Sequence, residues 1–398
     1  MTSVTATPAS TEEHRQHFPA LANKAYFNYG GQGPLPLEAI AAIQQAHELM
    51  QRSGPFSSEA NVWVGQEMGQ VRSAIAAELH VPPTSITLTE NVSMGCNIPL
   101  WGIDWRPGDH LLLSDCEHQS VFGIAQALQH RFGIELSVFP LLDTLNSGDP
   151  VAVITQHLRP TTRLVAISHV LWNTGQVLPL AEIVATCHAY PANAAPVRVF
   201  VDAAQSVGML PLNLTESAVD FYAFTGHKWW CGPAGLGGLY VSPEAADSLN
   251  PTFVGWRSVV KDDKGYPTGW LTDGRRFEVA TSDYPLGLAL REAIALHNVW
   301  GTAEDRYRRI CELSQYLWQR LVALDSIHCL ATHPPQSGLV SFQVTTGTLN
   351  HNQCVQQLEN EGFLLRTLPH PNCIRACVHY FTTETELDQL VTAIQALS

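Results

Sequence analysis

Two residues near the middle of the chain, Lys228 and Asp202, have the types and surroundings that a carbonyl cofactor requires. Lys228 lies in AFTGHKWWCGP, a segment short of charge, and Asp202 ends the apolar run VFV at positions 199–201. A single lysine is more often a solvated surface residue, but partial burial would lower its pKa and make it a nucleophile and later a base. An amine that can form a Schiff base and a buried carboxylate that keeps a pyridine nitrogen protonated are what pyridoxal 5′-phosphate (PLP) chemistry needs.

The residues after Asp202 extend the candidate site. The run DAAQS places Gln205 about one turn later, where its amide could hydrogen-bond the phenolic oxygen of the cofactor. An N-cap for a following helix is the alternative role for Asp202. Ligands of open α/β sheets collect at the carboxyl ends of strands, which favours the cofactor role.

A small-residue turn, NVSMG at positions 91–95, follows the apolar run ITLT and is a second candidate binding element. A strand that leads into such a turn and a helix N-terminus forms a ready anion site. Ser93 would supply a hydroxyl and a backbone N–H, and Met94 a second N–H. Such turns are frequent, so the motif alone is a weak indication of a phosphate site.

Expected strands and helices alternate along the chain, and these elements must position the candidate residues. The expected strands lie at residues 86–89, 110–114, 134–140, 163–168 and 197–201, and the expected helices at 37–52, 66–79, after 119, and at 181–189. This alternation predicts α/β architecture with a mainly parallel sheet.

From about residue 297 the pattern changes. The expected elements are a long helix at 302–324, a strand at 338–344, a helix at 352–361, strand segments near 364–365 and 374–378, and a closing helix from 384. We therefore expect an N-terminal arm over residues 1–20, a large PLP-binding domain over 21–296 and a small α+β domain over 297–398. Residues 21–50 could pack with the small domain.

Composition limits the classes of function. The chain has 398 residues, 45% of them hydrophobic and 15% charged, which indicates a globular protein with a large core. A net charge of −14 without a basic run argues against a nucleic-acid surface. We find no apolar stretch long enough for a membrane span and no secretory signal, so we expect no membrane association.

Cysteine and histidine usage points to the cytoplasm and away from metal chemistry. The 9 cysteines are scattered and form no C-x-x-C pair, which is typical of buried thiols in a reducing compartment. The 17 histidines include no H-E-x-x-H and no zinc-ligand spacing, so we expect no metal.

Together these motifs resemble aminotransferase class V, the family that contains the cysteine desulfurases. The resemblance implies the PLP-dependent transferase fold type I, with a seven-stranded sheet in the large domain. Asp202 and Gln205 match a D-x-x-Q segment of the family, and Ser93 matches its phosphate loop, where threonine is usual. Thr225 and His227 match its other phosphate contacts from the same subunit.

The resemblance also assigns residues outside these segments. His118, in CEHQS, matches the family's E-H-x-[SA] motif, whose imidazole stacks on the cofactor ring; a helix-capping or core histidine is the alternative. Asn173, in LWNTGQ, aligns with an asparagine near the cofactor oxygen. Thr281, in EVATSDYP, matches a residue that reaches the phosphate across a dimer interface, which implies a homodimer with a shared active site.

The expected substrate ligands lie mostly near the C-terminus. Arg375, in CIRACVHY, sits where the family has an arginine that grips the substrate α-carboxylate, and a bidentate guanidinium contact would fix an amino acid for reaction. Arg366, in FLLRT, is a possible second carboxylate ligand, with a surface salt bridge as its alternative role. Trp256 lies in a segment, PTFVGWRS, that could face the site.

Within the family, the chain is most similar to the L-cysteine/cystine C–S lyases. The matching landmarks include YFNYGGQG, SHVLWNTGQVLPLAEI, PTFVGWRS and RRFEVATSDYP, several of which are not general class V signatures. Desulfurases carry a catalytic cysteine on a mobile loop shortly before the carboxylate-binding arginine. Here that region reads FLLRTLPHPNCIR, which leaves little room for such a loop, and we expect Cys373 to be fixed in a strand.

The resemblance therefore predicts α,β-elimination from L-cystine, and more weakly from L-cysteine, to pyruvate, ammonia and a persulfide or sulfide. A sulfur-acceptor protein and a supply of sulfur for iron–sulfur clusters are possible extensions. The alternatives are a cysteine desulfurase, an isopenicillin-N-epimerase-like enzyme, and a PLP-binding or sulfur-carrier scaffold without turnover.

Overall fold

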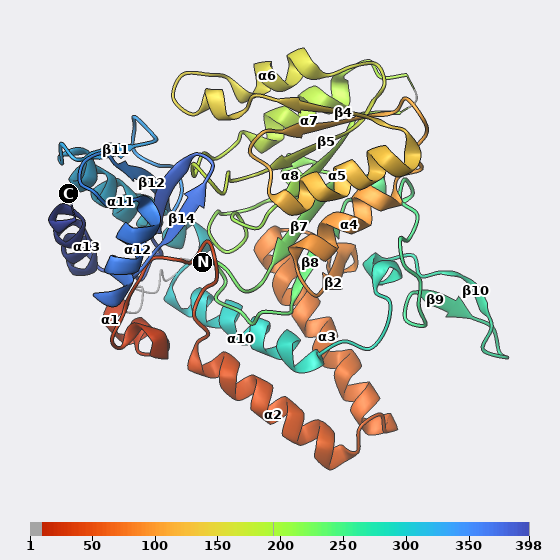
Figure 1. The fold of residues 1–398 in the computed structure, drawn as a ribbon. Helices are drawn as coiled ribbons and strands as arrows, with labels where there is room; N and C mark the ends of the chain where they lie inside the picture. The colour runs from red at the N-terminus through yellow and green to blue at the C-terminus, as the bar shows by residue number, and fades with distance from the viewer. Residues whose placement is uncertain (1–9, 194, 398) are drawn as a thin grey trace, which may run out of the picture.

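The computed structural model describes residues 10–193 and 195–397, and its centre is a seven-stranded sheet (Figure 1). The strands, in spatial order, are β2 (Ile86–Thr89), β8 (Gly237–Val241), β7 (Phe221–Thr225), β6 (Arg198–Asp202), β5 (Thr162–Ser168), β3 (His110–Ser114) and β4 (Glu135–Phe139). β8 is antiparallel to both of its neighbours, β2 and β7, and the other neighbouring pairs of this sheet are parallel. The structure thus confirms the predicted α/β class with a mainly parallel seven-stranded sheet.

The central strands are buried on both faces, which explains why they read as continuous apolar runs. Along β3, Leu112 packs into one hydrophobic cluster while Leu111 and Leu113 pack into another, because successive side chains point to opposite faces. The helices on the side of Leu111 and Leu113 are α4 (Val92–Gly102) and α5 (Gln119–Phe132). The helices that pack on the side of Leu112 are α3 (Ser58–Leu79), α6 (Pro150–His157), α7 (Leu180–Ala189) and α10 (Tyr284–Trp300).

The N-terminal segment joins several parts of the molecule. Residues 1–9 of the expected arm lie outside the described residues, and from Ser10 the chain forms α1 (Thr11–Arg15) and a 3-10 turn, η1 (Pro19–Leu21). Strand β1 (Ala25–Tyr26) then pairs in parallel with β13 (Phe363–Leu364) near the C-terminus. Helix α2 (Leu37–Ser53) packs instead on α10, where buried alanines of both helices meet.

The C-terminal part is an antiparallel sheet covered by helices. Its sheet contains, in order, β11 (Ile327–Cys329), β12 (Leu339–Val344), β15 (Asn372–Cys377) and β14 (Arg366–Pro369). Its helices are α11 (Ala303–Val322), α12 (His351–Asn360) and α13 (Glu384–Ala396). Helix α10 continues through the position between residues 296 and 297 where the sequence predicted a domain boundary. The division into domains stays a prediction.

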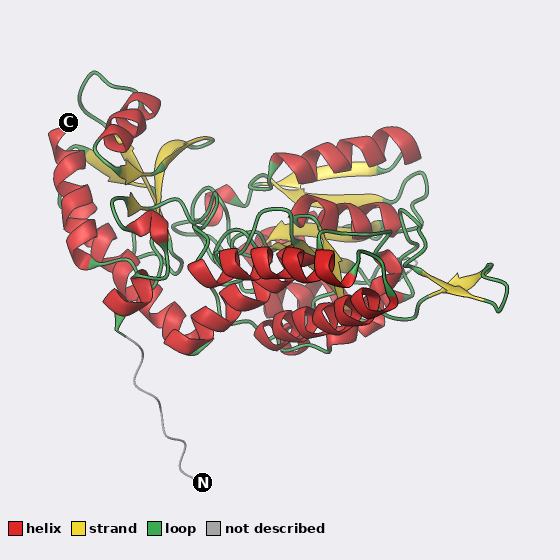
Figure 2. Ribbon diagram, turned by 90° about the horizontal axis from the view of Figure 1, so that it is seen from below, coloured by secondary structure: helices red, strands yellow, loops and turns green. Residues whose placement is uncertain are grey.

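Shorter elements connect these parts. They are η2 (Pro83–Ser85), η3 (Leu142–Thr144), α8 (Leu214–Ser217), α9 (Pro243–Ala246) and η4 (Gly274–Phe277). A two-stranded hairpin, β9 (Val259–Lys261) and β10 (Pro267–Trp270), projects from the body of the molecule in both views (Figures 1 and 2). None of the helices within the described ranges is both long and apolar enough to cross a bilayer.

Candidate active site

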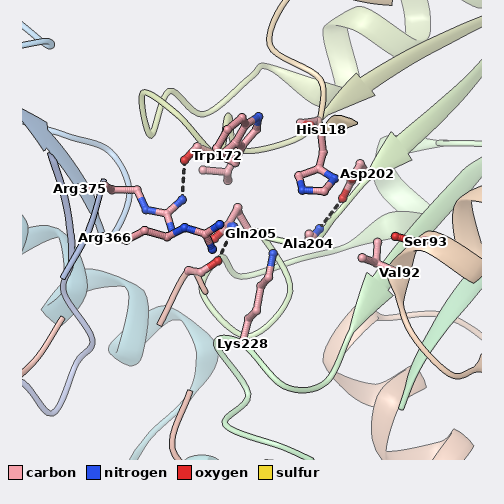
Figure 3. Close-up of a pocket in the computed structure, with 13 residues that line it drawn as sticks. Val92, Ser93, His118, Trp172, Asp202, Ala204, Gln205, Lys228, Arg366 and Arg375 are labelled. Carbon is pink, nitrogen blue, oxygen red and sulfur yellow. Dashed lines mark hydrogen bonds between the residues drawn. The ribbon is translucent and has the colours of Figure 1, made fainter. Parts of the chain in front are cut away.

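A pocket opens where the carboxyl ends of the central strands meet the C-terminal sheet (Figure 3). It is lined by Gly30, Val92, Ser93, His118, Ser168, Val170, Trp172, Asp202, Ala204, Gln205, Lys228, Arg366 and Arg375. The sequence-predicted residues that the structure brings together here are Ser93, His118, Asp202, Gln205, Lys228, Arg366 and Arg375. Of the described residues, no three or more His, Cys, Asp or Glu side chains gather in a way that could hold a metal ion.

Lys228 projects into this pocket from a turn that follows β7. The turn is held from two sides, because Gly33 N donates to the His227 carbonyl at 2.7 Å and Cys231 N donates to the Lys228 carbonyl at 3.0 Å. A Cβ atom on Gly33 would collide with the Lys228 carbonyl, so the glycine-rich loop at residues 26–34 must approach without a side chain. Burial lowers the pKa of Lys228 to about 8; Asp202 opposes that shift, and Arg375 adds to it.

Asp202 ends β6 and is 4% exposed. Its Oδ1 accepts a hydrogen bond from Ala204 N at 2.9 Å, and residues 204–209 form turns and not a helix, so the N-cap alternative is wrong here. Burial raises the pKa of Asp202, while that hydrogen bond and the charge of Lys228 act against the rise. A buried carboxylate of this kind is stabilised by a cationic partner, and a protonated pyridine nitrogen fits that requirement.

Gln205 is locked by two partners on either side of its amide. Its Nε2 donates to the Gly30 carbonyl at 2.9 Å, and its Oε1 accepts from Trp229 Nε1 at 3.0 Å. The indole N–H can only donate, so this contact fixes which end of the amide is oxygen. One N–H of the amide remains for a phenolic oxygen, which is compatible with the predicted contact.

His118 is both a helix cap and a pocket residue. Its Nδ1 accepts from Ser120 N at 3.3 Å at the start of α5, which leaves the proton on Nε2. The ring lines the pocket and meets the Trp172 ring edge to face, with centroids 5.9 Å apart. Burial lowers the pKa of His118, so the ring is neutral near pH 7. The capping alternative and the cofactor role are therefore compatible.

The start of α4 forms part of the pocket wall, but one expected donor is already used. Asn91 caps this helix, and its Oδ1 accepts from Met94 N at 3.0 Å. Ser93 lines the Lys228 pocket, whereas Met94 lines a neighbouring cavity. Met94 N is therefore already engaged at this helix start, and the predicted phosphate contacts of Ser93 and Met94 stay predictions.

The other predicted phosphate contacts lie behind the pocket wall. Thr225 is 2% exposed, and its Oγ1 is 2.7 Å from His227 Nδ1. Burial lowers the pKa of His227 to about 4, and the charge of Lys228 adds to this effect. Neither side chain reaches the lining of the pocket, so a phosphate role for this pair stays a prediction.

Two arginines face each other across the C-terminal hairpin. Arg366 on β14 and Arg375 on β15 are directly paired in register, a juxtaposition of like charges that costs stability unless an anion lies between them. Arg375 is only 1% exposed, and its Nη1 donates to the Trp172 carbonyl at 2.6 Å. Its Nε has no hydrogen-bond partner among the described residues. The pair is suited to a substrate carboxylate.

Besides Met94, Thr225 and His227, three more predicted residues do not line the pocket of this chain. Asn173 is buried beside it, with its carbonyl bound to Ser341 Oγ at 2.7 Å. Thr281 is exposed and lines two other cavities. Trp256 is 48% exposed and packs its ring against Arg257. The predicted roles of these three residues therefore stay predictions.

Sequence reasoning missed several lining residues. Gly30 is the clearest case, because a Cβ atom there would lie 2.7 Å from Arg375 Nη2. Glu117 lies just beneath the pocket: its carboxylate accepts from Ser168 N at 3.0 Å and from Ser168 Oγ at 2.8 Å. Burial raises the pKa of Glu117 to about 8. The glycine run and the CEHQS motif were visible in the sequence, but these contacts were not.

Cys373 lies in β15, fully buried, and burial raises the pKa of its thiol to about 11. The segment before Arg375 is the β14–β15 hairpin, with no extended loop between its strands. The structure therefore confirms that Cys373 is fixed in a strand.

Comparisons with known proteins place the chain in a family. The sequence model of the family described as aminotransferase class-V matches residues 25–390. The chain is 29% identical over 393 residues to isopenicillin N epimerase of Streptomyces clavuligerus, covering 93% of this chain and 94% of the epimerase. It is 31% identical over 333 residues to a cysteine desulfurase of Shigella sonnei, covering 78% and 76% of the two chains.

Solved structures of the cystine C–S lyase C-DES are also similar. One, a complex with its reaction product cysteine persulfide, is 52% identical with a TM-score of 0.94, covering 96% of this chain and 100% of that chain. Another, a lysine-to-alanine variant with glycine covalently linked to the PLP cofactor, is 52% identical with a TM-score of 0.95, covering 96% and 99%.

Proposed function

The chain belongs to aminotransferase class V, and we propose that it is a PLP-dependent C–S lyase that cleaves L-cystine by α,β-elimination. The observation that carries the proposal is one pocket that holds a lysine of lowered pKa, a buried aspartate and a buried arginine to which the described part of the chain offers no acidic partner. The likeness to C-DES supports the choice of substrate.

Each residue of the pocket has a chemical task in this proposal. PLP, when bound, supplies the aldehyde that takes the substrate amine and the ring that withdraws electrons from Cα. Arg375 holds the substrate carboxylate, with Arg366 nearby at the pocket rim. Lys228 Nζ removes the Cα proton, which its lowered pKa allows near neutral pH. Asp202 supplies the negative charge for the pyridine nitrogen, and His118 covers the site.

The leaving group explains why cystine is the preferred substrate. Breaking the Cβ–S bond of cystine releases cysteine persulfide, which is a weaker base than sulfide and leaves more readily. One water molecule then converts the three-carbon fragment to pyruvate and ammonia. The reaction is an elimination and a hydrolysis, so it requires no external oxidant or reductant.

Two relatives suggest other reactions. A desulfurase would need a mobile thiol near the substrate sulfur, and Cys373, the cysteine nearest to Arg375 in the sequence on its N-terminal side, is buried in β15. An epimerase would remove and return the Cα proton without breaking a bond to sulfur. Cysteine persulfide as a product of C-DES favours the lyase over both alternatives.

We further propose a cytoplasmic homodimer in which Thr281 of each subunit reaches the phosphate site of the other. Its support is that Thr281 is exposed and lies away from the pocket of its own chain. Exposed apolar residues cluster in the same region, and their burial by a second subunit would stabilise the dimer; they are Phe253, Val254, Trp256, Val260, Tyr266, Trp270 and Val279. Transfer of the persulfide sulfur to an acceptor protein for iron–sulfur clusters completes the proposal.

The products distinguish the three reactions. The PLP-loaded protein should be incubated with L-cystine or L-cysteine in deuterated water, and pyruvate, alanine and deuterated amino acid measured. The lyase releases pyruvate, faster from cystine than from cysteine. Alanine without pyruvate would establish a desulfurase, and deuterium at Cα with intact substrate would establish an epimerase.

A further inference from the structure

The turn that carries Lys228 lies in neither a helix nor a strand, yet its carbonyl groups are all bound. The Gly226 carbonyl accepts from Gly232 N, and the His227 and Lys228 carbonyls accept from Gly33 N and Cys231 N. Buried carbonyls must be paired in this way, because an unpaired one costs free energy. The next two carbonyls, those of Trp229 and Trp230, have no backbone donor among the described residues and depend on side chains.

Two buried histidines supply these bonds. His379 Nε2 lies 3.0 Å from the Trp229 carbonyl, and His297 Nε2 lies 2.9 Å from the Trp230 carbonyl. A carbonyl can only accept, so both Nε2 atoms carry the proton. Tyr380 N donates to His379 Nδ1 at 3.1 Å, which confirms this tautomer for His379.

The second histidine ends a longer chain of hydrogen bonds. His297 Nδ1 lies 2.6 Å from Tyr380 Oη, which lies 2.7 Å from His14 Nε2. Because His297 Nδ1 carries no proton, the tyrosine must donate to it and accept from His14. All three histidines are buried, and burial holds their pKa values below the ordinary value, so the chain is neutral. The positive charge of Arg306 also lowers the pKa of His297.

His379 also connects the Lys228 turn to Arg375, the arginine expected to bind the substrate carboxylate. His379 lies two residues after β15, the strand that carries Arg375, and the residue between them, Val378, donates its N–H to the Gly338 carbonyl at 2.6 Å. A Cβ atom on Gly338 would lie 2.6 Å from the Trp229 ring, so the turn and the C-terminal sheet are in close contact. The distance between the lysine and the carboxylate-binding arginine is therefore set partly through His379.

We propose that His297 and His379 are positioning residues for Lys228: each donates its Nε2 proton to a carbonyl of the lysine turn and so holds the amine toward the substrate Cα. This inference rests on the proposed role of Lys228. It adds that the site depends on residues buried behind it, including α1 through His14, and not only on those that line the pocket.

Leucine and glutamine variants test this inference. His379→Leu and His297→Leu remove the N–H donor, whereas His379→Gln and His297→Gln keep an N–H near the Nε2 position. His110→Leu provides the matched control. His110 is also a buried histidine, but it begins β3 at the end of the strand away from the pocket, and its Nδ1 lies 2.8 Å from Thr162 Oγ1. The readouts are the rate at which ligand-free protein captures PLP, measured by visible absorbance, and the separate kcat and KM values for L-cystine.

We expect both leucine variants to capture PLP more slowly and to lose about 10- to 100-fold in kcat, since a small misplacement of a reacting group has effects of this size. KM should change by less than about threefold. The glutamine variants should recover most of the loss, and His110→Leu should lower thermal stability alone. If the leucine variants do not fold, Tyr380→Phe, which removes only the hydroxyl bound to His297, should show a smaller loss in the same two readouts.

Two results would overturn the inference. Either normal PLP capture and kcat in the leucine variants, or glutamine variants as impaired as leucine variants, would mean that these hydrogen bonds do not position Lys228. Failure of the proposed function is recognised separately, because the parent protein itself would then release no pyruvate from L-cystine, whereas failure of this inference leaves pyruvate release by the parent intact.

Discussion

Replacement of Arg375 by methionine separates substrate binding from folding. Arg375 is 1% exposed, and the described residues offer its guanidinium the Trp172 carbonyl but no carboxylate. Methionine has a similar length and fills irregular space, so Arg375→Met removes the charge with little loss of packing. Arg366→Met, at the exposed arginine opposite, is the matched control.

The expected loss follows from burial. Removing one partner of a buried, hydrogen-bonded charge pair costs about 2–5 kcal/mol. At about 1.4 kcal/mol per factor of ten, this corresponds to a decrease of about 30- to 4,000-fold in kcat/KM for L-cystine. An exposed pair contributes about 0.2–1 kcal/mol, so Arg366→Met should lose less than about fivefold.

The stability of the ligand-free protein should not fall in the Arg375→Met variant, in contrast to its activity. In the absence of substrate, Arg375 is a buried charge without an anion, which is costly, while its hydrogen bond to Trp172 contributes a smaller favourable amount. The free energy of unfolding of ligand-free Arg375→Met should therefore equal or exceed that of the parent. Steady-state kinetics and urea denaturation measure the two effects. A kcat/KM within about fivefold of the parent, or a marked loss of stability, would refute the reasoning.

Three further predictions concern the surroundings of the pocket. Gly30→Ala places a Cβ atom 2.7 Å from Arg375 Nη2, so KM for cystine should rise while the spectrum of bound PLP is unchanged; a normal KM would show that the arginine adapts. The rate of PLP capture by ligand-free protein should rise about tenfold per pH unit and level off near pH 8, because burial lowers the pKa of Lys228 to about 8. Capture that continues to rise to pH 10 would indicate an ordinary lysine. Glu117 has its pKa raised to about 8 by burial, from 4.5, so it contributes stability below pH 4.5 that is lost as the pH rises through 8. The parent should therefore lose stability relative to Glu117→Gln over this interval in urea denaturation, and a constant difference would contradict the shifted pKa.

The sequence was sufficient for the fold and for the centre of the site. Apolar runs identified five of the seven strands of the central sheet. The ends of neighbouring parallel strands meet at one edge of a sheet, so Asp202 was expected there. Lys228 follows β7, which was not among the strands expected from the sequence, so its place in the site was expected from its motif and the family resemblance. The cofactor and the family follow from this arrangement and its motifs.

What the sequence did not indicate depends on contacts between distant segments. The strands of the β9–β10 hairpin are short and mostly exposed, so their sequence has no clear alternation of apolar and polar residues that would have predicted them. Met94 N was expected to be free, but Asn91, three residues earlier, caps it. The chain from His14 through Tyr380 to His297 joins the two ends of the sequence to α10, and no local pattern encodes such a network.

The central claim is that sulfur leaves the substrate by elimination and not by transfer to an enzyme thiol. The most direct test is the amount of pyruvate released per L-cystine consumed by the PLP-loaded protein, with the Cys373→Ala variant measured alongside. We predict one pyruvate for each cystine, at similar rates in both proteins, since Cys373 is buried in a strand. Alanine in place of pyruvate, lost in the Cys373→Ala variant, would contradict the account.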